Sequence, residues 1–221
     1  MSARVILLTD PSGSGKTSPL RRIGARRLNL DEFYSDGTEP GMPLLDGEVS
    51  GPQGVRPDEA MSRIDWDHPA SWDAERAMAA IRELCAAGGT RVPVYSLPDN
   101  ATRGHRDLDI GQAPVFVAEE IFASELVERC RAEGLIAEAL VLRRPRAQTW
   151  WFRLRRDLSE HRKPLPVLLT RGLRLARSER ERIDRWVAQG CRPVSRRERE
   201  ALTTRLIASP GVPEPRADGA A

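Results

Sequence analysis

Seven residues near the start of the chain have the types and the spacing of a loop that holds phosphate groups. They run from Pro11 to Thr17 with the sequence PSGSGKT. Small residues let backbone N–H groups converge on phosphate oxygens, and the start of a following helix adds partial positive charge. In such a loop the lysine reaches the β and γ phosphates, and the Ser or Thr hydroxyl after it helps to hold Mg²⁺. The predicted nucleotide-binding residues are Ser12, Gly13, Ser14, Gly15, Lys16 and Thr17.

The elements beside this loop are those that a phosphate site needs. Residues 4–9, RVILLT, form an apolar run typical of a buried strand in a parallel sheet, and a helix can follow Thr17. A second short strand is expected over residues 26–31. Since ligands of open α/β sheets bind beyond the carboxyl ends of the strands, Asp31 and Tyr34 should emerge beside the loop.

Strands and helices alternate along the next hundred residues. Further strands are expected over residues 91–97, 113–118 and 135–142, with a polar loop through Asp99 to His105. Helices are expected from a cap at Ser71 to about residue 87, and over residues 121–133. This alternation predicts an α/β fold, a parallel sheet covered by helices on both faces.

The chain is long enough for one domain, which we expect to span residues 1–208. A mobile insertion is expected at about 35–60, a basic helical lid at about 150–165, and a disordered tail at 209–221. The net charge of +3 does not suggest a nucleic-acid partner, and no apolar run is long enough to cross a membrane. Three cysteines without metal-ligand spacing are interpreted as reduced thiols, which favours a cytoplasmic protein.

Taken together and in order, the motifs resemble the uridine kinase family, also called the uridine-cytidine kinase family, of P-loop kinases. The resemblance covers most of residues 4–175. It implies a P-loop NTPase-type sheet with a small helical lid, and ATP- and Mg²⁺-dependent phosphorylation of a nucleoside such as uridine or cytidine at its 5′-hydroxyl. The motifs that carry it are GSGKT, Asp31-Glu32-Phe33-Tyr34, Trp66-Asp67-His68-Pro69, Pro93-Val94-Tyr95, Ala118-Glu119, and Arg153-Leu154-Arg155-Arg156-Asp157 with Glu160 after it.

The resemblance also implies a role for each matching residue. Asp31 stands at the place of the catalytic base and acts with Lys16 and Arg156. The lid arginines close over the phosphates, and Arg153 also reaches the substrate. The implied substrate-binding residues are Tyr34, Trp66, Asp67, Tyr95 and Arg153, with Asp67 on the ribose hydroxyls, and the implied metal-binding residues are Thr17 and Glu119.

Four positions depart from the family pattern. Asp10 replaces the first loop glycine, and Glu120 replaces the glycine that usually follows the strand-end Glu. At a distance of roughly 7 Å and an effective dielectric constant of about 20, the Coulomb repulsion between Asp10 and a phosphate would be about 2 kcal/mol. Ser96 and Asn100 stand where the family has an Asp and a base-reading His, so uracil selectivity does not carry over.

Three functions therefore stay open on the sequence alone. The first is a nucleoside kinase, with activity that the extra carboxylates could attenuate. The second is a nucleotide-binding protein with little turnover, whose Arg-rich C-terminal half binds nucleic acid or a protein partner. The third is a kinase for another small alcohol, as in phosphoribulokinase and bacterial pantothenate kinase. Assembly into a homo-oligomer is also left open.

Overall fold

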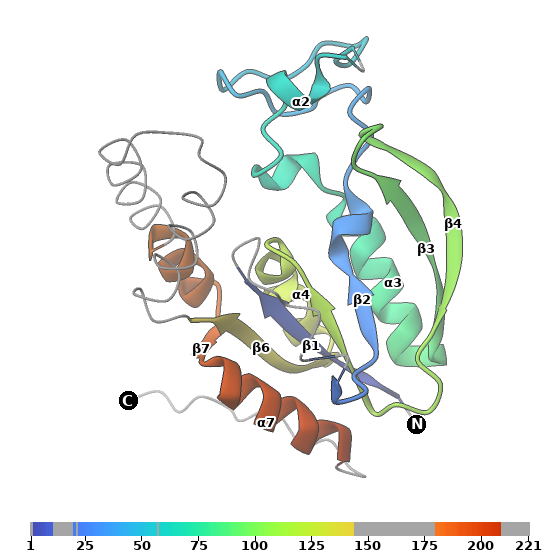
Figure 1. Ribbon diagram of the computed structural model, residues 1–221, viewed down its shortest axis with the longest axis vertical. Helices are drawn as coiled ribbons and strands as arrows, with labels where there is room; N and C mark the ends of the chain where they lie inside the picture. Colours follow the sequence, from blue (N-terminus) through green and yellow to red (C-terminus); the bar gives the residue numbers. More distant parts are fainter. Residues whose placement is uncertain (1, 11–19, 21, 57, 144–179, 209–221) are drawn as a thin grey trace, which may run out of the picture.

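The protein is built around one five-stranded parallel sheet with the strand order β2-β5-β1-β6-β7 (Figure 1). The computed structural model describes residues 2–10, 20, 22–56, 58–143 and 180–208. The sheet confirms the predicted α/β fold, although β7 was not expected because three residues are too few to show a periodicity. The strands are β1 (Arg4–Thr9), β2 (Arg27–Asn29), β5 (Val115–Glu119), β6 (Ile136–Leu142) and β7 (Arg192–Val194).

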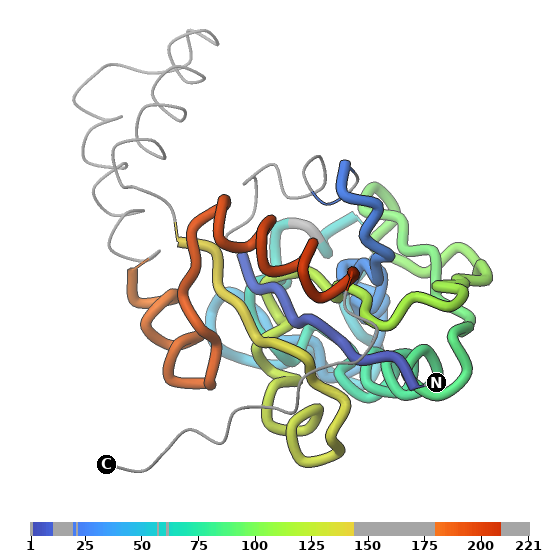
Figure 2. The backbone as a smooth tube through the Cα atoms, turned by 90° about the horizontal axis from the view of Figure 1, so that it is seen from below, coloured from blue at the N-terminus to red at the C-terminus, as the bar shows by residue number. Residues whose placement is uncertain are grey.

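Alternate residues of each strand are buried on opposite faces of the sheet. In β1, Leu7 lies in the core beneath α3 (Ala74–Ala87) and α4 (Val127–Ala132). Its neighbour Leu8 points to the other face, where α7 (Arg196–Ala208) packs. Figure 2 shows α7 and α4 on opposite sides of the strands β1 and β6. Because both faces are covered, the strands read as continuous apolar runs, which is why the sequence identified them.

Helix α3 begins two residues later than expected. The side chain of Asp73 accepts a hydrogen bond from the Arg76 backbone N–H at 2.9 Å and is the N-cap. The predicted cap, Ser71, instead ends a 3₁₀ turn, η2 (Pro69–Ser71), and its hydroxyl donates to the His68 carbonyl at 2.7 Å. Gly88 ends the helix, as the sequence predicted, with a left-handed φ of 76°.

In the middle of the chain one predicted strand is present but lies in another sheet, and the predicted polar loop is wrong. The strand expected over 91–97 is β3 (Gly89–Ser96), but it pairs with β4 (Ala101–Asp109) in a separate antiparallel sheet. Most of the expected polar loop is therefore the strand β4. Because β4 has no fully buried residue, its sequence lacks the apolar alternation that marks a strand.

The strand expected to end at Asp31 ends earlier, at Asn29. The chain then forms a 3₁₀ turn, η1 (Leu30–Phe33), and the Asn29 side chain accepts a hydrogen bond from the Asp31 N–H at 3.4 Å. Asp31 thus sits on a turn that follows the strand. The turn lies on the carboxyl side of the sheet, where the sequence placed it.

The insertion after η1 has a small core of its own and is tied to the tip of the β3-β4 hairpin. Asp36 Oδ1 accepts a hydrogen bond from the Thr102 N–H at 2.7 Å, and the Asn100 carbonyl accepts one from the Gly37 N–H at 2.8 Å. Its mobility stays a prediction, and the predicted lid and tail lie outside the described residues. The segment ends with α2 (Ala60–Arg63), and its buried core is Met42, Leu44, Val55, Ala60 and Ile64.

Gly88 and Gly134 give a matched test of the turn that ends α3. Both have left-handed φ angles, of 76° and 66°, but a Cβ at Gly88 would lie 3.0 Å from the Gly111 carbonyl oxygen, whereas a Cβ at Gly134 meets nothing within 4 Å. A left-handed L-residue costs about 1–2 kcal/mol. We expect Gly134→Ala to lose about that much unfolding free energy in urea titrations and Gly88→Ala to lose more. Equal losses would contradict the close approach at Gly88.

Candidate functional site

The carboxyl ends of β1, β2 and β5 meet at one edge of the sheet, and each leads into an acidic residue. Glu119 of β5 is in register with Leu8 of β1 and with Asn29 of β2. Asp10 follows β1 directly, and Asp31 follows β2 by two residues. The chain runs from β1 to strands on both of its sides, so β1 marks the switch point at which α/β sheets bind ligands.

The predicted phosphate loop starts from this edge. Its residues, 12–17, lie outside the described part of the chain, as do Arg153 and Arg156. The residues on either side are described: Asp10 ends β1, and Leu20 is helical and fully buried against Ile6 and Leu8. The strand before the loop and the helical residue after it therefore have the places that the sequence predicted.

Glu119 is the buried carboxylate at the centre of this edge. Its side chain is 3% exposed, and Oε1 forms an ion pair with Arg27 of β2. The other oxygen, Oε2, is buried and has no hydrogen-bond partner in the described structure. Burying a carboxylate is costly unless it is paired, and an unsatisfied buried acceptor costs a further 1–3 kcal/mol, roughly. The free oxygen therefore destabilises the fold by itself, but it is a suitable ligand for a cation.

A Mg²⁺ ion fits this arrangement when it arrives with a nucleotide. Mg²⁺ in nucleotide sites is held by one or two protein oxygens together with phosphate oxygens and water. Glu119 offers one such oxygen, and the sequence places the Thr17 hydroxyl on the loop that follows β1. Among the described residues no group of three or more His, Cys, Asp or Glu side chains could hold a metal alone.

Three aromatic residues that the sequence singled out lie together beside the carboxylates. The ring of Tyr34 is 5.7 Å from that of Trp66 and 5.8 Å from that of Tyr95, centre to centre. The Tyr34 hydroxyl donates to the Trp66 carbonyl at 3.4 Å. Phe122, 5.9 Å from Tyr34, completes the cluster and was missed, because an apolar residue after Glu119-Glu120 gave no sign of a special role.

The Tyr34 hydroxyl faces carboxylates from three segments of the chain. Burial raises the pKa of Tyr34 well above its usual value, and the negative charges of Asp31, Glu120 and Asp67 raise it further. Burial likewise raises the pKa of Tyr95. Both phenols therefore stay neutral at any physiological pH. The predicted base, Asp31, and the predicted ribose ligand, Asp67, therefore both lie close enough to Tyr34 to raise its pKa.

Asp67 lies at the open side of this cluster. Its side chain is 68% exposed and lies 3.7 Å from Arg182 of the helix at 180–188. Arg182 was not predicted, because nothing distinguishes it from the other arginines of an Arg-rich segment. The contact of Asp67 with a ribose stays a prediction.

The four departures from the family pattern have different structural settings. Asp10 and Glu120 are both buried, at 0% and 6% exposure. Ser96 and Asn100 form the tip of the β3-β4 hairpin: the Ser96 hydroxyl donates to Asp99 at 2.6 Å, and Asn100 has a left-handed φ of 49°. These two residues hold a turn, which explains their types without a role in base recognition.

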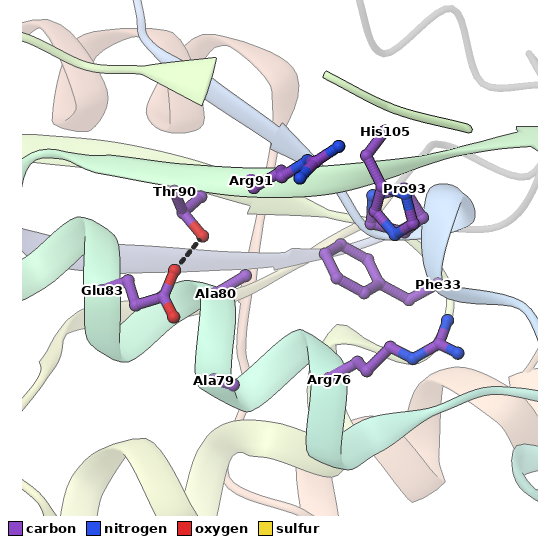
Figure 3. Close-up of a pocket in the computed structure, with 9 residues that line it drawn as sticks. All are labelled: Phe33, Arg76, Ala79, Ala80, Glu83, Thr90, Arg91, Pro93 and His105. Atoms are coloured by element: carbon purple, nitrogen blue, oxygen red, sulfur yellow. Dashed lines mark hydrogen bonds between the residues drawn. The ribbon is translucent and has the colours of Figure 1, made fainter. Parts of the chain in front are cut away.

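A shallow cleft of about 150 Å³ lies between α3 and the hairpin (Figure 3). Arg76, Arg91 and His105 line it together with the ring of Phe33. It contains none of the predicted catalytic, binding or metal residues, although Phe33 and Pro93 belong to two of the quoted motifs. The cleft and the acidic edge of the sheet are therefore separate places, joined only through η1, which carries both Phe33 and Asp31.

Comparison with known proteins finds no matching family model and no matching curated protein. Three solved structures are similar at low identity. Phosphoribulokinase from Rhodobacter spheroides is 16% identical with a TM-score of 0.43, and the match covers 72% of this chain and 57% of that one. A possible uridine kinase from Bacillus stearothermophilus is 15% identical with a TM-score of 0.42, covering 68% and 76%. A candidate fructose transport system kinase from a Silicibacter species is 14% identical with a TM-score of 0.47, covering 78% and 80%.

The chain thus spans little more than half the length of the phosphoribulokinase. In the part of the chain that the structure describes, no helix has the length and apolar character needed to cross a membrane.

The two tyrosines allow a direct test of the aromatic cluster, since the chain has no others. Their pKa values are raised in the folded state, so the unfolded state releases these protons first as the pH rises. Stability from the neutral phenols is complete below the unfolded pKa of about 10 and declines above it. We expect phenolate absorbance to rise only together with alkaline unfolding, followed by circular dichroism. A phenolate step near pH 10 in the folded protein would contradict this packing, and Tyr34→Phe and Tyr95→Phe would each identify its share.

Proposed function

We propose that this protein is an ATP- and Mg²⁺-dependent phosphotransferase that acts on a hydroxyl group of a small molecule. One observation carries the proposal: β1 leads into the Gly-Ser-Gly-Lys-Thr loop at the edge where Glu119 ends β5, and Asp31, which follows β2, lies close to Tyr34 of the aromatic cluster. A phosphate-binding loop, a cation ligand, a carboxylate base and an acceptor surface are the parts that phosphoryl transfer requires.

The chemistry divides among these parts. Phosphoryl transfer depends mainly on alignment and on stabilising the negative charge of the transferring group. The loop amides and Lys16 would bind the triphosphate, and Thr17 and Glu119 would hold Mg²⁺, which neutralises charge on the phosphates. Arg153 and Arg156 would add positive charge around the same group.

Asp31 would orient the acceptor hydroxyl and accept its proton. The 3₁₀ turn η1, which directly follows β2, presents this carboxylate toward the aromatic cluster. Tyr34, next to it, stays neutral and donates its hydrogen bond to the Trp66 carbonyl. The phenol therefore acts as a wall of the acceptor site and does not compete with Asp31 for the proton.

We propose a nucleoside as the acceptor, phosphorylated at its 5′-hydroxyl. The rings of Tyr34, Trp66 and Tyr95 form an aromatic surface next to Asp31, which suits the flat face of a base. Asp67, exposed at the open side of that cluster, suits ribose hydroxyls. Another small alcohol is the second candidate, because Ser96 and Asn100 shape a turn and offer no evident contact for a base.

The decisive experiment is a screen of the purified protein for ATP-dependent phosphorylation of nucleosides, ribulose 5-phosphate and pantothenate. We expect product with at least one pyrimidine nucleoside and none when Mg²⁺ is chelated. Transfer to another alcohol alone would replace the acceptor but keep the phosphotransferase. ATP binding without transfer to any acceptor would favour the nucleotide-binding protein and contradict the proposal.

Asp31→Asn tests the proposed base. An amide cannot take the proton of the acceptor hydroxyl, and positioned general bases typically contribute about 10²–10⁴-fold to the rate. We expect the turnover number to fall by about that factor, while the affinity for ATP, measured by calorimetry, stays nearly unchanged.

Glu32→Gln is the matched control for this change. Glu32 is the next residue on η1, but its carboxylate accepts hydrogen bonds from Arg106 of β4 at 3.0 and 3.1 Å. We expect it to keep most of the activity. If Asp31→Asn kept more than about a tenth of the turnover, below the range expected for a base, Asp31 would not be the proton acceptor.

A further inference from the structure

We propose that Arg27 is the positioning residue for Glu119 and thereby couples the divalent cation to nucleotide binding. The inference rests on the proposed function and adds to it a residue that the sequence motifs do not include. Arg27 belongs to β2, and Glu119 is the last residue of β5 beside it.

The register of the two strands explains why these side chains meet. Arg27 is opposite Val117, and Asn29 is opposite Glu119. Because side chains alternate along a strand, Arg27, Val117 and Glu119 all point to the same face of the sheet. The long Arg27 side chain extends toward the carboxyl edge and reaches Glu119 Oε1.

The ion pair leaves the two oxygens of Glu119 in different states. Oε1 is held by the Arg27 guanidinium, and Oε2 is buried without a hydrogen-bond partner in the described structure. A planar guanidinium fixes the orientation of the carboxylate that it binds more firmly than a point charge does. Arg27 therefore fixes which oxygen remains for a cation and in which direction that oxygen points.

The charge of Arg27 matters at this edge as well. Asp10 directly follows β1, Glu120 directly follows β5, and both are buried. The edge therefore carries several negative groups. A positive side chain next to Glu119 offsets part of the repulsion among these carboxylates. Residues that orient a metal ligand in this way typically change metal affinity by about 10–100-fold when they are removed.

The opposite role, in which Arg27 competes with the cation for Glu119, predicts a different geometry. A competitor would occupy both oxygens, whereas Arg27 contacts Oε1 and leaves Oε2 without a partner. The two roles also predict opposite effects when Arg27 is replaced. The experiment below separates them.

The test measures ATP affinity by calorimetry in MgCl₂ and again in EDTA, for the full chain and its variants. The quantity of interest is the ratio of the two affinities, which reports the coupling between cation and nucleotide. We expect Arg27→Gln to reduce this ratio by about tenfold or more and to leave the affinity in EDTA nearly unchanged. Arg27→Lys, which keeps the charge without the guanidinium fork, should recover part of the ratio.

Arg26→Gln is the matched control, because Arg26 is the preceding residue and its side chain is exposed. We expect its ratio to equal that of the wild type. An Arg27→Gln ratio that is unchanged, whether both affinities stay the same or both fall by the same factor, would show a merely structural role and overturn the proposal. A higher ratio would establish Arg27 as a competitor and also overturn it.

If Arg27→Gln does not fold, Arg27→Lys carries the test: a reduced ratio supports the positioning role, and a wild-type ratio contradicts it. If the wild type itself binds no ATP in either buffer, the proposed function fails and the positioning role fails with it. If the wild type binds ATP with a clear Mg²⁺ effect that Arg27→Gln retains, only the role of Arg27 fails.

Discussion

The structure depends on how negative charge is kept at the carboxyl edge of an otherwise apolar sheet. The strands β1 and β5 are buried on both faces, so Glu119 at their edge has little access to water. A buried carboxylate persists only where a cation or several hydrogen bonds compensate it. Arg27 compensates one of its oxygens within the protein. The proposed Mg²⁺ would compensate the other oxygen.

The proposed acceptor side of the site is held together by aromatic packing and not by the sheet. Tyr34 follows η1, Trp66 follows the insertion, and Tyr95 belongs to the β3-β4 hairpin, yet their rings meet within 6 Å of Tyr34. The hydrogen bonds from Thr102 to Asp36 and from Gly37 to Asn100 tie the insertion to the hairpin tip. The proposed acceptor surface is therefore assembled from three segments outside the main sheet that contact one another.

The residues proposed for the phosphate donor and those proposed for the acceptor belong to different parts of the fold. The phosphate loop and Glu119 belong to the central strands, whereas Tyr34, Trp66 and Tyr95 belong to the connections. Asp31 lies on a short turn that is fixed at both ends, by Asn29 before it and by buried Phe33 after it. The proposed base therefore follows a strand of the sheet and lies close to Tyr34 of the aromatic cluster.

The sequence by itself determined the central strands, the phosphate loop and the end of α3, because buried apolar runs and glycines carry strong local signals. It also named Asp31, Glu119 and the three aromatic residues. The tertiary structure alone decided that β3 and β4 leave the main sheet as a hairpin, since a strand with no buried face has no pattern to detect. It also decided the contacts of Arg27 and Phe122, because their partners are distant in the sequence and an arginine or an apolar residue looks the same in every setting. The register of β2 against β5, which pairs Arg27 with Glu119, is a property of two strands together and is encoded in neither segment alone.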